Sequence, residues 1–300
     1  MKVLVTGVAG QLGHDVMNEL ASRNLEGYGT DLAETYAGIQ DGTSVCRAPY
    51  VSLDITDAQA VQKVMDEVHP DAVVHCAAWT AVDKAEDMPD VVRKVNAEGT
   101  KNIVDACKKQ DIPVMYFSTD YVFNGEGTNP WMEYGHREPL NVYGQTKYEG
   151  ELAVESYPKH FIIRISWVFG KNGNNFIKTM LRLGKERGAV SVVNDQIGTP
   201  TYTFDLAKLV VDMIQTDKYG IYHATNSGDF ISWYDFACEI FKQAGMNDVK
   251  VTPVDSTAFP AKATRPKNSR MNQTELDKNG FKRLPAWQDA LARYLKEIEF

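Results

Sequence analysis

Tyr143 and Lys147 stand four residues apart in the segment NVYGQTKYEG, and the residues that follow have helical spacing. Side chains at positions i and i+4 of a helix lie over one another, so the ammonium would lie beside the phenol. A neighbouring cation favours the ionised phenol and lowers its pKa from an ordinary value of about 10. The spacing predicts a pair that transfers a proton, and the competing interpretation is a chance pair on a solvated helix face.

A second group of polar side chains ends the apolar segment PVMYFST. Ser118 and Thr119 close that segment, and Asp120 and Tyr121 follow directly. A hydroxyl at the end of a strand can donate a hydrogen bond to a carbonyl oxygen whose negative charge grows as hydride arrives. Thr119 is therefore a candidate for stabilising a reacting ketone, and the alternative is a simple cap of the next turn.

The elements that must position these groups alternate between short apolar runs and helix-length amphipathic stretches. This alternation predicts βαβ units and an α/β fold with a doubly wound parallel sheet of Rossmann type. Segments such as DAVVHCAA are apolar on both faces, as expected for strands covered by helices on both sides. Helices are expected from Gln11, after Asp57 and after Pro89. Ser232 with Asp235 resembles a capping box before another helix.

Composition narrows the class of protein. The chain has 300 residues and a formal net charge of −8, with acidic residues spread along its length, which gives no electrostatic footprint for nucleic acid and no polybasic membrane anchor. No apolar run is long enough to span a membrane, and we expect a cytoplasmic protein. The four cysteines lack CxxC spacing, Cys76 is expected to be a small buried side chain, and the histidines form no paired ligand pattern. We predict no metal site.

The first apolar run leads into Gly7, Gly10 and Gly13, and a helix is expected from Gln11. Glycines at these positions permit a tight turn and a close approach of the backbone to a pyrophosphate at the helix N-terminus. The spacing indicates a dinucleotide site, and the alternative is a ligand-free turn. Asp31 ends the second apolar segment, where a carboxylate can accept both hydroxyls of an adenine ribose.

Further residues at strand ends complete a predicted cofactor groove. Asp54 closes VSLD and could reach the adenine, and the small Ala77 and Ala78 would let a cofactor pass close to the backbone, unless they only pack tightly. We expect residues 1–170 to form the dinucleotide-binding domain, with a return segment near 200–226. Residues 171–300 should form mainly a smaller C-terminal lobe that binds the substrate.

The segments GVAGQLG, STDYVF and YGQTK occur in the order typical of one enzyme class, and the chain resembles the extended short-chain dehydrogenase/reductase family. More narrowly, it is similar to the dTDP-4-dehydrorhamnose reductase family through STDYVFNG, YGQTKYEGE, RISWVFG, GNNFIKTML and NDQIGTPT. The resemblance covers nearly the whole chain. It implies NADH- or NADPH-dependent reduction of the C4 ketone of dTDP-4-dehydro-L-rhamnose to dTDP-L-rhamnose.

The resemblance also assigns roles by position. It implies that Tyr143 donates the proton, that Lys147 lowers the pKa of Tyr143 and holds the nicotinamide ribose, and that Thr119 binds the C4 oxygen. The implied cofactor contacts are Gly7, Gly10, Gln11, Leu12, Gly13, Asp31, Asp54, Ile55, Ala77, Ala78, Trp79, Thr80, Phe117, Tyr143 and Lys147. The implied contacts with the dTDP-sugar are Thr119, Asp120, Val82, Trp167, Asn175 and Arg265.

Some of these assignments have alternatives. Trp167 could stack on the deoxysugar or be a core tryptophan. Asn175 and Arg265 could bind the pyrophosphate of dTDP, or they could have surface or lobe-packing roles. The segment of residues 34–50 is longer than the family pattern needs, which leaves the choice between NADH and NADPH open. Arg47 in this segment could bind a 2′-phosphate. Some members of the family pair through a magnesium-linked contact. We predict a monomer or homodimer without metal.

Three rival functions differ in testable ways. Sugar-nucleotide dehydratases of this fold place Asp-Glu after the catalytic Thr, because dehydration needs a further acid and base, whereas this chain has Asp120 and Tyr121. An epimerase would use the same Tyr143 and Lys147 but retain its cofactor. A non-catalytic protein similar to the regulatory subunit of methionine adenosyltransferase is the third, and an intact set of Thr119, Tyr143 and Lys147 counts against it.

Overall fold

A computed structural model describes all residues 1–300. Its centre is a sheet of seven strands, and every pair of neighbouring strands in it is parallel. From one edge to the other the strands are β11 (Gly220–His223), β6 (His160–Ile165), β5 (Val114–Thr119), β4 (Ala72–His75), β1 (Lys2–Thr6), β2 (Glu26–Asp31) and β3 (Tyr50–Ser52). The predicted doubly wound parallel sheet is confirmed.

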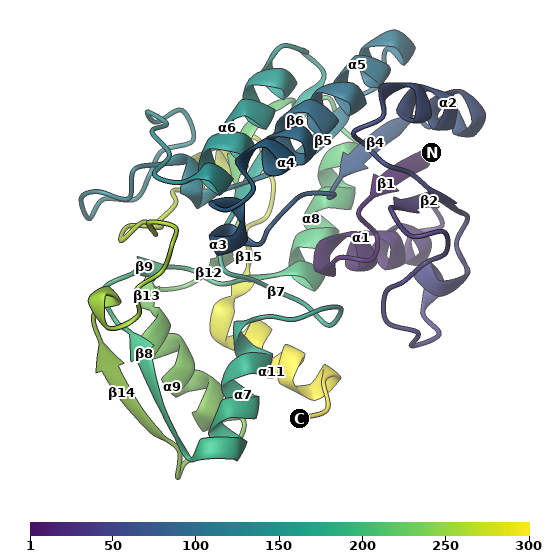
Figure 1. Cartoon of the computed structure of the whole chain (residues 1–300). Helices are drawn as coiled ribbons and strands as arrows, with labels where there is room; N and C mark the ends of the chain where they lie inside the picture. The colour runs from purple at the N-terminus through teal and green to yellow at the C-terminus, as the bar shows by residue number, and fades with distance from the viewer.

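Helices cover both faces of this sheet (Figure 1). Both β4 and β5 are buried along their whole length, because helices take water away from both of their faces. One face packs against α1 (Gln11–Ser22) and α8 (Thr203–Ile214). The opposite face packs against α2 (Ala58–Val68), α5 (Thr100–Gln110) and α6 (Val142–Glu155).

The helix starts follow the capping signals of the sequence. The Asp57 carboxylate accepts hydrogen bonds from the backbone N–H groups of the first turn of α2. Ser232 and Asp235 form a reciprocal capping box at α9 (Trp233–Gln243). The side chain of Asn141 accepts from the Gly144 N–H at 2.8 Å and so fixes the start of α6, the helix that carries Tyr143.

The protein has four shorter helical segments, three directly after β4 and one in the C-terminal part of the chain. They are α3 (Val82–Ala85), α4 (Pro89–Arg93), a π-helical turn at Lys94–Gly99 that joins α4 to α5, and α10 (Thr274–Lys278). Single 3-10 turns occupy Ser44–Arg47, Asp120–Val122 and Ser256–Ala258. No helix of the protein combines the length and the apolar character that crossing a bilayer requires.

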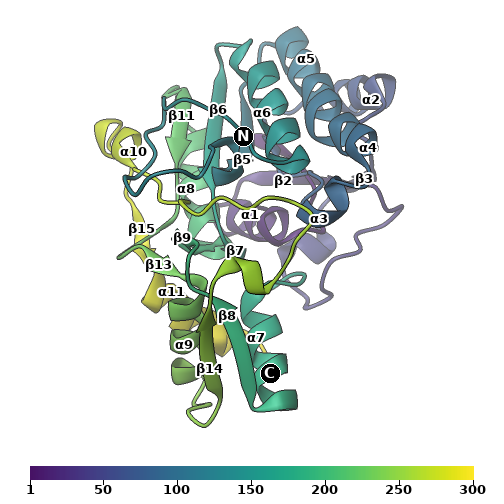
Figure 2. The ribbon, with the colours of Figure 1, turned by 60° about the vertical axis from the view of Figure 1, so that its left-hand side comes forward.

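A second, smaller body lies below the sheet in Figures 1 and 2. Its core joins α7 (Phe176–Arg187), α9 and α11 (Trp287–Glu297) to the parallel pair of β8 (Ala189–Val193) and β14 (Lys250–Val254). Short strand pairs connect the two bodies: β7 (Val168–Phe169) with β10 (Thr201–Tyr202), β9 (Ile197–Gly198) with β13 (Ile231–Ser232), and β12 (Asn226–Ser227) with β15 (Leu284–Ala286). The predicted domain boundary at residue 170 stays a prediction.

Candidate active-site cleft

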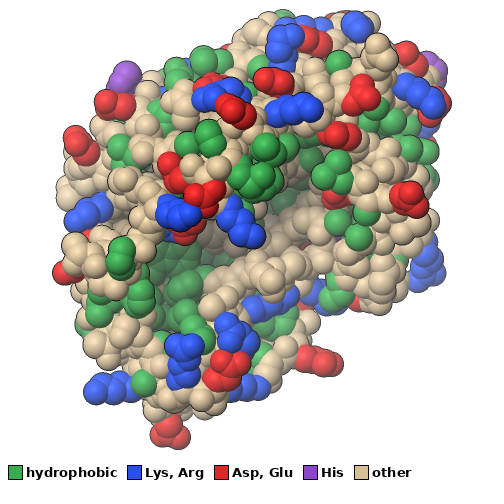
Figure 3. All heavy atoms as spheres, viewed as in Figure 1, with side chains coloured by type: hydrophobic (Ala, Val, Ile, Leu, Met, Phe, Trp, Pro, Cys, Tyr) green, Lys and Arg blue, Asp and Glu red, His purple; other side chains and the backbone are tan.

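A cleft with a volume of about 680 Å³ lies beyond the carboxyl ends of the strands. This is where ligands bind in doubly wound sheets. The face seen in Figure 1 is hollowed between the two bodies, and hydrophobic side chains gather in the hollow (Figure 3). The predicted residues that line the cleft are Gly7, Gly10, Gln11, Leu12, Gly13, Asp31, Asp54, Ile55, Ala77, Ala78, Thr80, Val82, Phe117, Thr119, Asp120, Tyr143, Lys147 and Trp167.

The glycine turn between β1 and α1 leaves no room for a side chain at Gly7 or Gly13. Gly7 has a φ of +69°, and a Cβ there would lie 2.7 Å from the backbone of Ala77. A Cβ at Gly13 would lie 2.4 Å from the carbonyl oxygen of Gly7. Gly10 precedes α1 without any side-chain cap, so the first N–H groups of that helix remain available to an anion. The turn fits the pyrophosphate of a dinucleotide.

The carboxylate of Asp31 is fixed by the same turn. One of its oxygens accepts from the Ala9 N–H at 3.0 Å and the other from the Leu32 N–H at 2.8 Å. Asp54, which follows the neighbouring strand β3, also lines the cleft and accepts from the Thr56 N–H at 2.8 Å. Lys147 is the only lysine or arginine among the lining residues, so no cation lines the part of the cleft where Asp31 would meet the adenine ribose.

A network of buried polar side chains holds the part of the cleft wall that lies beside the glycine turn. Thr6 accepts from the Ala77 N–H at 3.1 Å and contacts His75 at 2.7 Å. Burial lowers the pKa of His75 to about 3, so its ring is neutral. Asn96, in the π-helical turn, accepts from the Trp79 N–H at 2.8 Å and donates to Thr146 at 3.2 Å. The wall is thereby tied to helix α6.

Thr119 ends β5 with its hydroxyl inside the cleft. The hydroxyl donates to Asp120 at 3.0 Å and accepts from the Tyr121 N–H at 3.2 Å. Asp120 is 2% exposed and also accepts from Ser269. Burial raises the pKa of Asp120 to about 6, although the hydrogen bonds from Ser269 and Thr119 favour its ionised form.

Tyr143 and Lys147 project from α6 into the same cleft, one turn apart. Burial raises the pKa of Tyr143, the Thr119 hydroxyl lowers it in part, and Asp120 raises it further. The Lys147 ammonium lies over the Tyr116 ring, 4.1 Å from its centroid. The expected lowering of the Tyr143 pKa by Lys147 is not seen: burial raises that pKa, and Lys147 is not among the groups that shift it.

The Lys147 ammonium is itself unusual. Burial lowers its pKa to about 7, and the negative charge of Glu151 one turn further along α6 opposes this effect. Glu151 is fully buried and receives two hydrogen bonds from Arg164, at 2.7 and 2.8 Å. Helix α6 therefore rests on a buried ion pair.

This chain and several characterised proteins share both sequence and architecture. The family model of the RmlD substrate binding domain matches residues 1–300. The dTDP-4-dehydrorhamnose reductase of Escherichia coli K12 is 38% identical over 309 residues, which cover 99% of this chain and 98% of that protein. The chain belongs to the dTDP-4-dehydrorhamnose reductase family. The resemblance predicted from the sequence motifs is confirmed.

Solved structures of the family have the same fold. The Clostridium acetobutylicum dTDP-4-dehydrorhamnose reductase is 41% identical, with a TM-score of 0.89 over 99% of both chains. The Bacillus anthracis dTDP-4-dehydrorhamnose reductase, solved in complex with NADP, is also 41% identical, with a TM-score of 0.90 over 99% of both chains. The similarity extends over both bodies of the chain.

The structure keeps three of the predicted site residues out of the cleft lining. The Trp79 indole donates to the Ala81 carbonyl at 3.2 Å. Asn175 caps α7, and its amide donates to Gln11 at 3.1 Å. The Arg265 guanidinium is held by Asp83, with contacts at 2.7 and 3.1 Å. The latter two occupy lobe-packing positions, the alternative that their residue types also allowed.

The Trp167 ring is covered by another aromatic ring. The backbone leaves the extended conformation between β6 and β7 at Trp167, which has a φ of +50°. Trp233 stacks on it with a centroid distance of 3.8 Å and an interplanar angle of 16°. A Cβ on Gly198 would lie 3.0 Å from the Trp167 ring. Trp167 therefore reaches the cleft as part of a stacked pair.

Sequence reasoning missed several residues that line the cleft. Trp233 has no sequence signal beyond its position after the Ser232 cap. Tyr121 packs edge-on against Tyr143 at 5.6 Å, and its position beside Thr119 could have identified it. Cys76, expected to be buried, is half-buried and lies in the cleft wall.

Proposed function

We propose that this protein reduces the C4 ketone of dTDP-4-dehydro-L-rhamnose to dTDP-L-rhamnose with NADH or NADPH. The observation that supports it best is that Thr119, Tyr143 and Lys147 face one cleft together with the glycine turn. The relatives are dTDP-4-dehydrorhamnose reductases, and we infer the sugar nucleotide from them.

In this proposal Tyr143 donates the proton that the product hydroxyl needs. Reduction of a ketone creates an alkoxide, which is a far stronger base than a phenolate, so the donor must enter the reaction protonated. Burial of Tyr143 raises its pKa and keeps the phenol protonated at neutral pH. The phenol is therefore in the protonated form that a proton donor needs.

Thr119 and Lys147 would complete the site. The Thr119 hydroxyl donates to Asp120, and rotation about one bond would direct its proton toward a substrate oxygen. Lys147, whose pKa is lowered to about 7, would place a positive charge or a hydrogen-bond donor beside the ribose of the nicotinamide. The bound dinucleotide supplies the hydride.

The remaining predicted contacts belong to the same proposal. Gly10, Gln11 and Leu12 would hold the pyrophosphate of the cofactor, and Asp31 would accept from the adenine ribose. Trp167 and Val82 would form the wall for the deoxysugar. The residues that follow Thr119 support reduction over dehydration, because Tyr121 occupies the position at which a dehydratase has a carboxylate. We further propose a cytoplasmic enzyme, since all four cysteines are free.

The decisive experiment is direct. Purified protein with dTDP-4-dehydro-L-rhamnose should oxidise NADH or NADPH, followed as the loss of absorbance of the reduced nicotinamide. Consumption of one cofactor per sugar distinguishes reduction from epimerisation, in which the cofactor is retained. Absence of oxidation with either cofactor contradicts the proposal and favours a regulatory nucleotide-binding protein.

A further inference from the structure

One loop of the second body reaches back to the glycine turn. Asn172 lies between β7 and α7, is 5% exposed, and donates from its amide to the Ala9 carbonyl at 2.8 Å and the Gly10 carbonyl at 3.2 Å. Its own carbonyl accepts from the Ile39 N–H at 3.0 Å. One buried amide thus joins the turn to the insertion, residues 34–50, and both segments are far from Asn172 in sequence.

These contacts orient the groups that an anion would meet. In a trans peptide the carbonyl and the following N–H point in opposite directions. Asn172 holds the Gly10 carbonyl, so the Gln11 N–H faces away from it, at the free end of α1. The neighbouring Asn175 donates to the Gln11 side chain at 3.1 Å. Two amides of this loop therefore brace the two residues that begin the helix.

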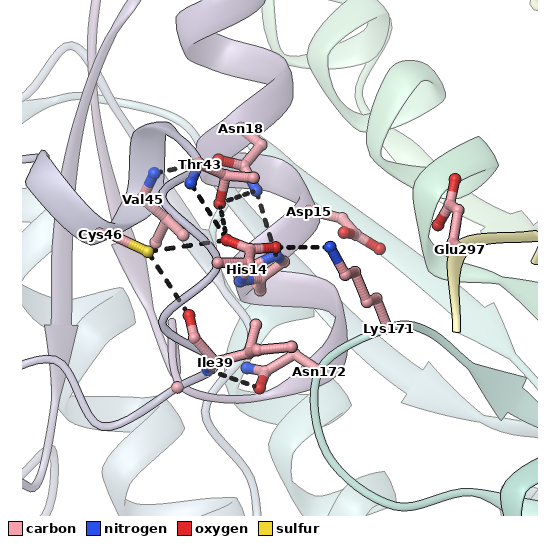
Figure 4. A network of polar contacts seen from close by, with 12 residues as sticks. His14, Asp15, Asn18, Ile39, Thr43, Val45, Cys46, Lys171, Asn172 and Glu297 are labelled. Atoms are coloured by element: carbon pink, nitrogen blue, oxygen red, sulfur yellow. Dashed lines mark hydrogen bonds and ion pairs between the residues drawn. The ribbon is translucent and has the colours of Figure 1, made fainter. Parts of the chain in front are cut away.

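The insertion anchors the loop from its other side. The Lys171 ammonium contacts Asp41 at 2.8 Å, and Thr43 donates to the same carboxylate at 2.6 Å. Burial works against ionisation of Asp41, but the hydrogen bonds from Lys171 and Thr43 hold its pKa below the ordinary value. Asn18 of α1 donates to Thr43 at 3.2 Å. Figure 4 shows this network between the insertion, α1 and the loop.

The same loop is continuous with the opposite end of the cleft. Trp167 and Val168, which line the cleft, precede Asn172 by only a few residues. A Cβ on Gly170 would lie 2.1 Å from the Thr203 hydroxyl and 3.3 Å from Gln11. The backbone at Gly170 is therefore closely packed against α1 and α8.

We propose that Asn172 is a positioning residue that couples the two ends of the cleft, so that dinucleotide and nucleoside diphosphate each strengthen the binding of the other. Such coupling is reciprocal by thermodynamic necessity. The dinucleotide part rests on the geometry of the turn, and the nucleoside diphosphate part rests on the function proposed above.

The selective test is Asn172→Asp. Aspartate keeps the acceptor for the Ile39 N–H but loses both donors and places a carboxylate against two carbonyl oxygens. NADH affinity should fall roughly 10- to 100-fold, as expected for two lost hydrogen bonds plus repulsion. Asn172→Ala should cost roughly 5- to 30-fold on the same grounds. Lys171→Met is the matched control, because it removes the Asp41 ion pair from the same loop and leaves the turn contacts intact.

The measurement is the dissociation constant of NADH from its fluorescence, alone and with saturating dTDP. Wild-type protein and Lys171→Met should bind NADH several-fold more tightly with dTDP, and Asn172→Asp should lose this gain at a temperature at which the variant is folded. A loss of NADH affinity with the dTDP gain preserved, or no loss of affinity, overturns the proposal. If NADH binding depends on Asn172 but the wild-type protein turns over no dTDP-sugar, the result contradicts the proposed function instead.

Discussion

The buried pair of Glu151 and Arg164 beneath the catalytic helix gives a prediction that links stability to activity. Arg164 is 0% exposed and donates to Glu151 through two nitrogens, and a third contact reaches the Glu133 carbonyl at 2.6 Å. Arg137 adds a hydrogen bond to Glu151 at 2.9 Å. Glu151→Leu removes the carboxylate and leaves a buried guanidinium without its counter-charge.

The expected magnitudes follow from the cost of a broken buried pair. Glu151→Leu should reduce the free energy of unfolding by about 3–5 kcal/mol, because the desolvated charge of Arg164 loses its compensation. The double variant with Arg164→Met removes both charges, and replacement of both partners is often close to neutral. We expect a cost of about 1–2 kcal/mol for it, because Glu133 and Arg137 also lose a partner.

The same carboxylate acts on Lys147. Because Glu151 raises the pKa of Lys147 against the effect of burial, Glu151→Gln should lower that pKa below about 7. The limb of the kcat/KM profile that reports Lys147 should therefore move to lower pH. Arg164 and its neighbours hold the Glu151 pKa below its ordinary value despite burial. Its stabilisation is thus present above the ordinary glutamate pKa and is lost as pH falls through the folded-state value.

The assay is urea unfolding of the wild type, both single variants and the double variant, together with pH–rate profiles of wild type and Glu151→Gln. Equal m-values would make the midpoints comparable. A coupling free energy between the two substitutions below about 0.5 kcal/mol would refute the reasoning, because it would mean that the two charges act independently. An unshifted pH profile in Glu151→Gln would separate Glu151 from Lys147.

Three further predictions test the site and its surroundings. Tyr143→Phe should lower turnover by about 10²- to 10⁴-fold and leave the NADH dissociation constant within about twofold of wild type; unchanged turnover would remove Tyr143 from the mechanism. NADH should bind at least about 10-fold more tightly than NADPH, since a 2′-phosphate would meet the Asp31 carboxylate without a cation, and Asp31→Ala should narrow this ratio in a fluorescence titration. Burial raises the Asp15 pKa to about 7, so the contribution of Asp15 to the stability of the wild type should fall as pH rises from about 4 to 7. Asp15→Asn keeps an acceptor for Thr203 and should remove that slope, giving about 1–3 kcal/mol more stability above pH 7 in urea unfolding; an unchanged slope would show that Asp15 does not titrate in this range.

Local signals in the sequence predicted the sheet and the helix starts well. Their information lies within a few residues: Asp57 caps its own first turn, and Ser232 pairs with Asp235 three positions later. The runs that are apolar on both faces required helices on both sides of the sheet, and the structure confirms this arrangement. The family was also predictable, because several modest motifs occurred together in one order.

The sequence by itself determined which residues could do chemistry, because residue type and helical spacing place Tyr143 and Lys147 on one side of a helix. Only the tertiary structure decided how those groups behave. Burial raises the Tyr143 pKa, and Lys147 does not contribute the expected lowering. Trp233 covers the Trp167 ring from a helix more than sixty residues away in sequence. The insertion and Asn172 meet the glycine turn through contacts that no local pattern encodes. Burial and long-range contact depend on the whole packed chain, whereas spacing depends on neighbours alone.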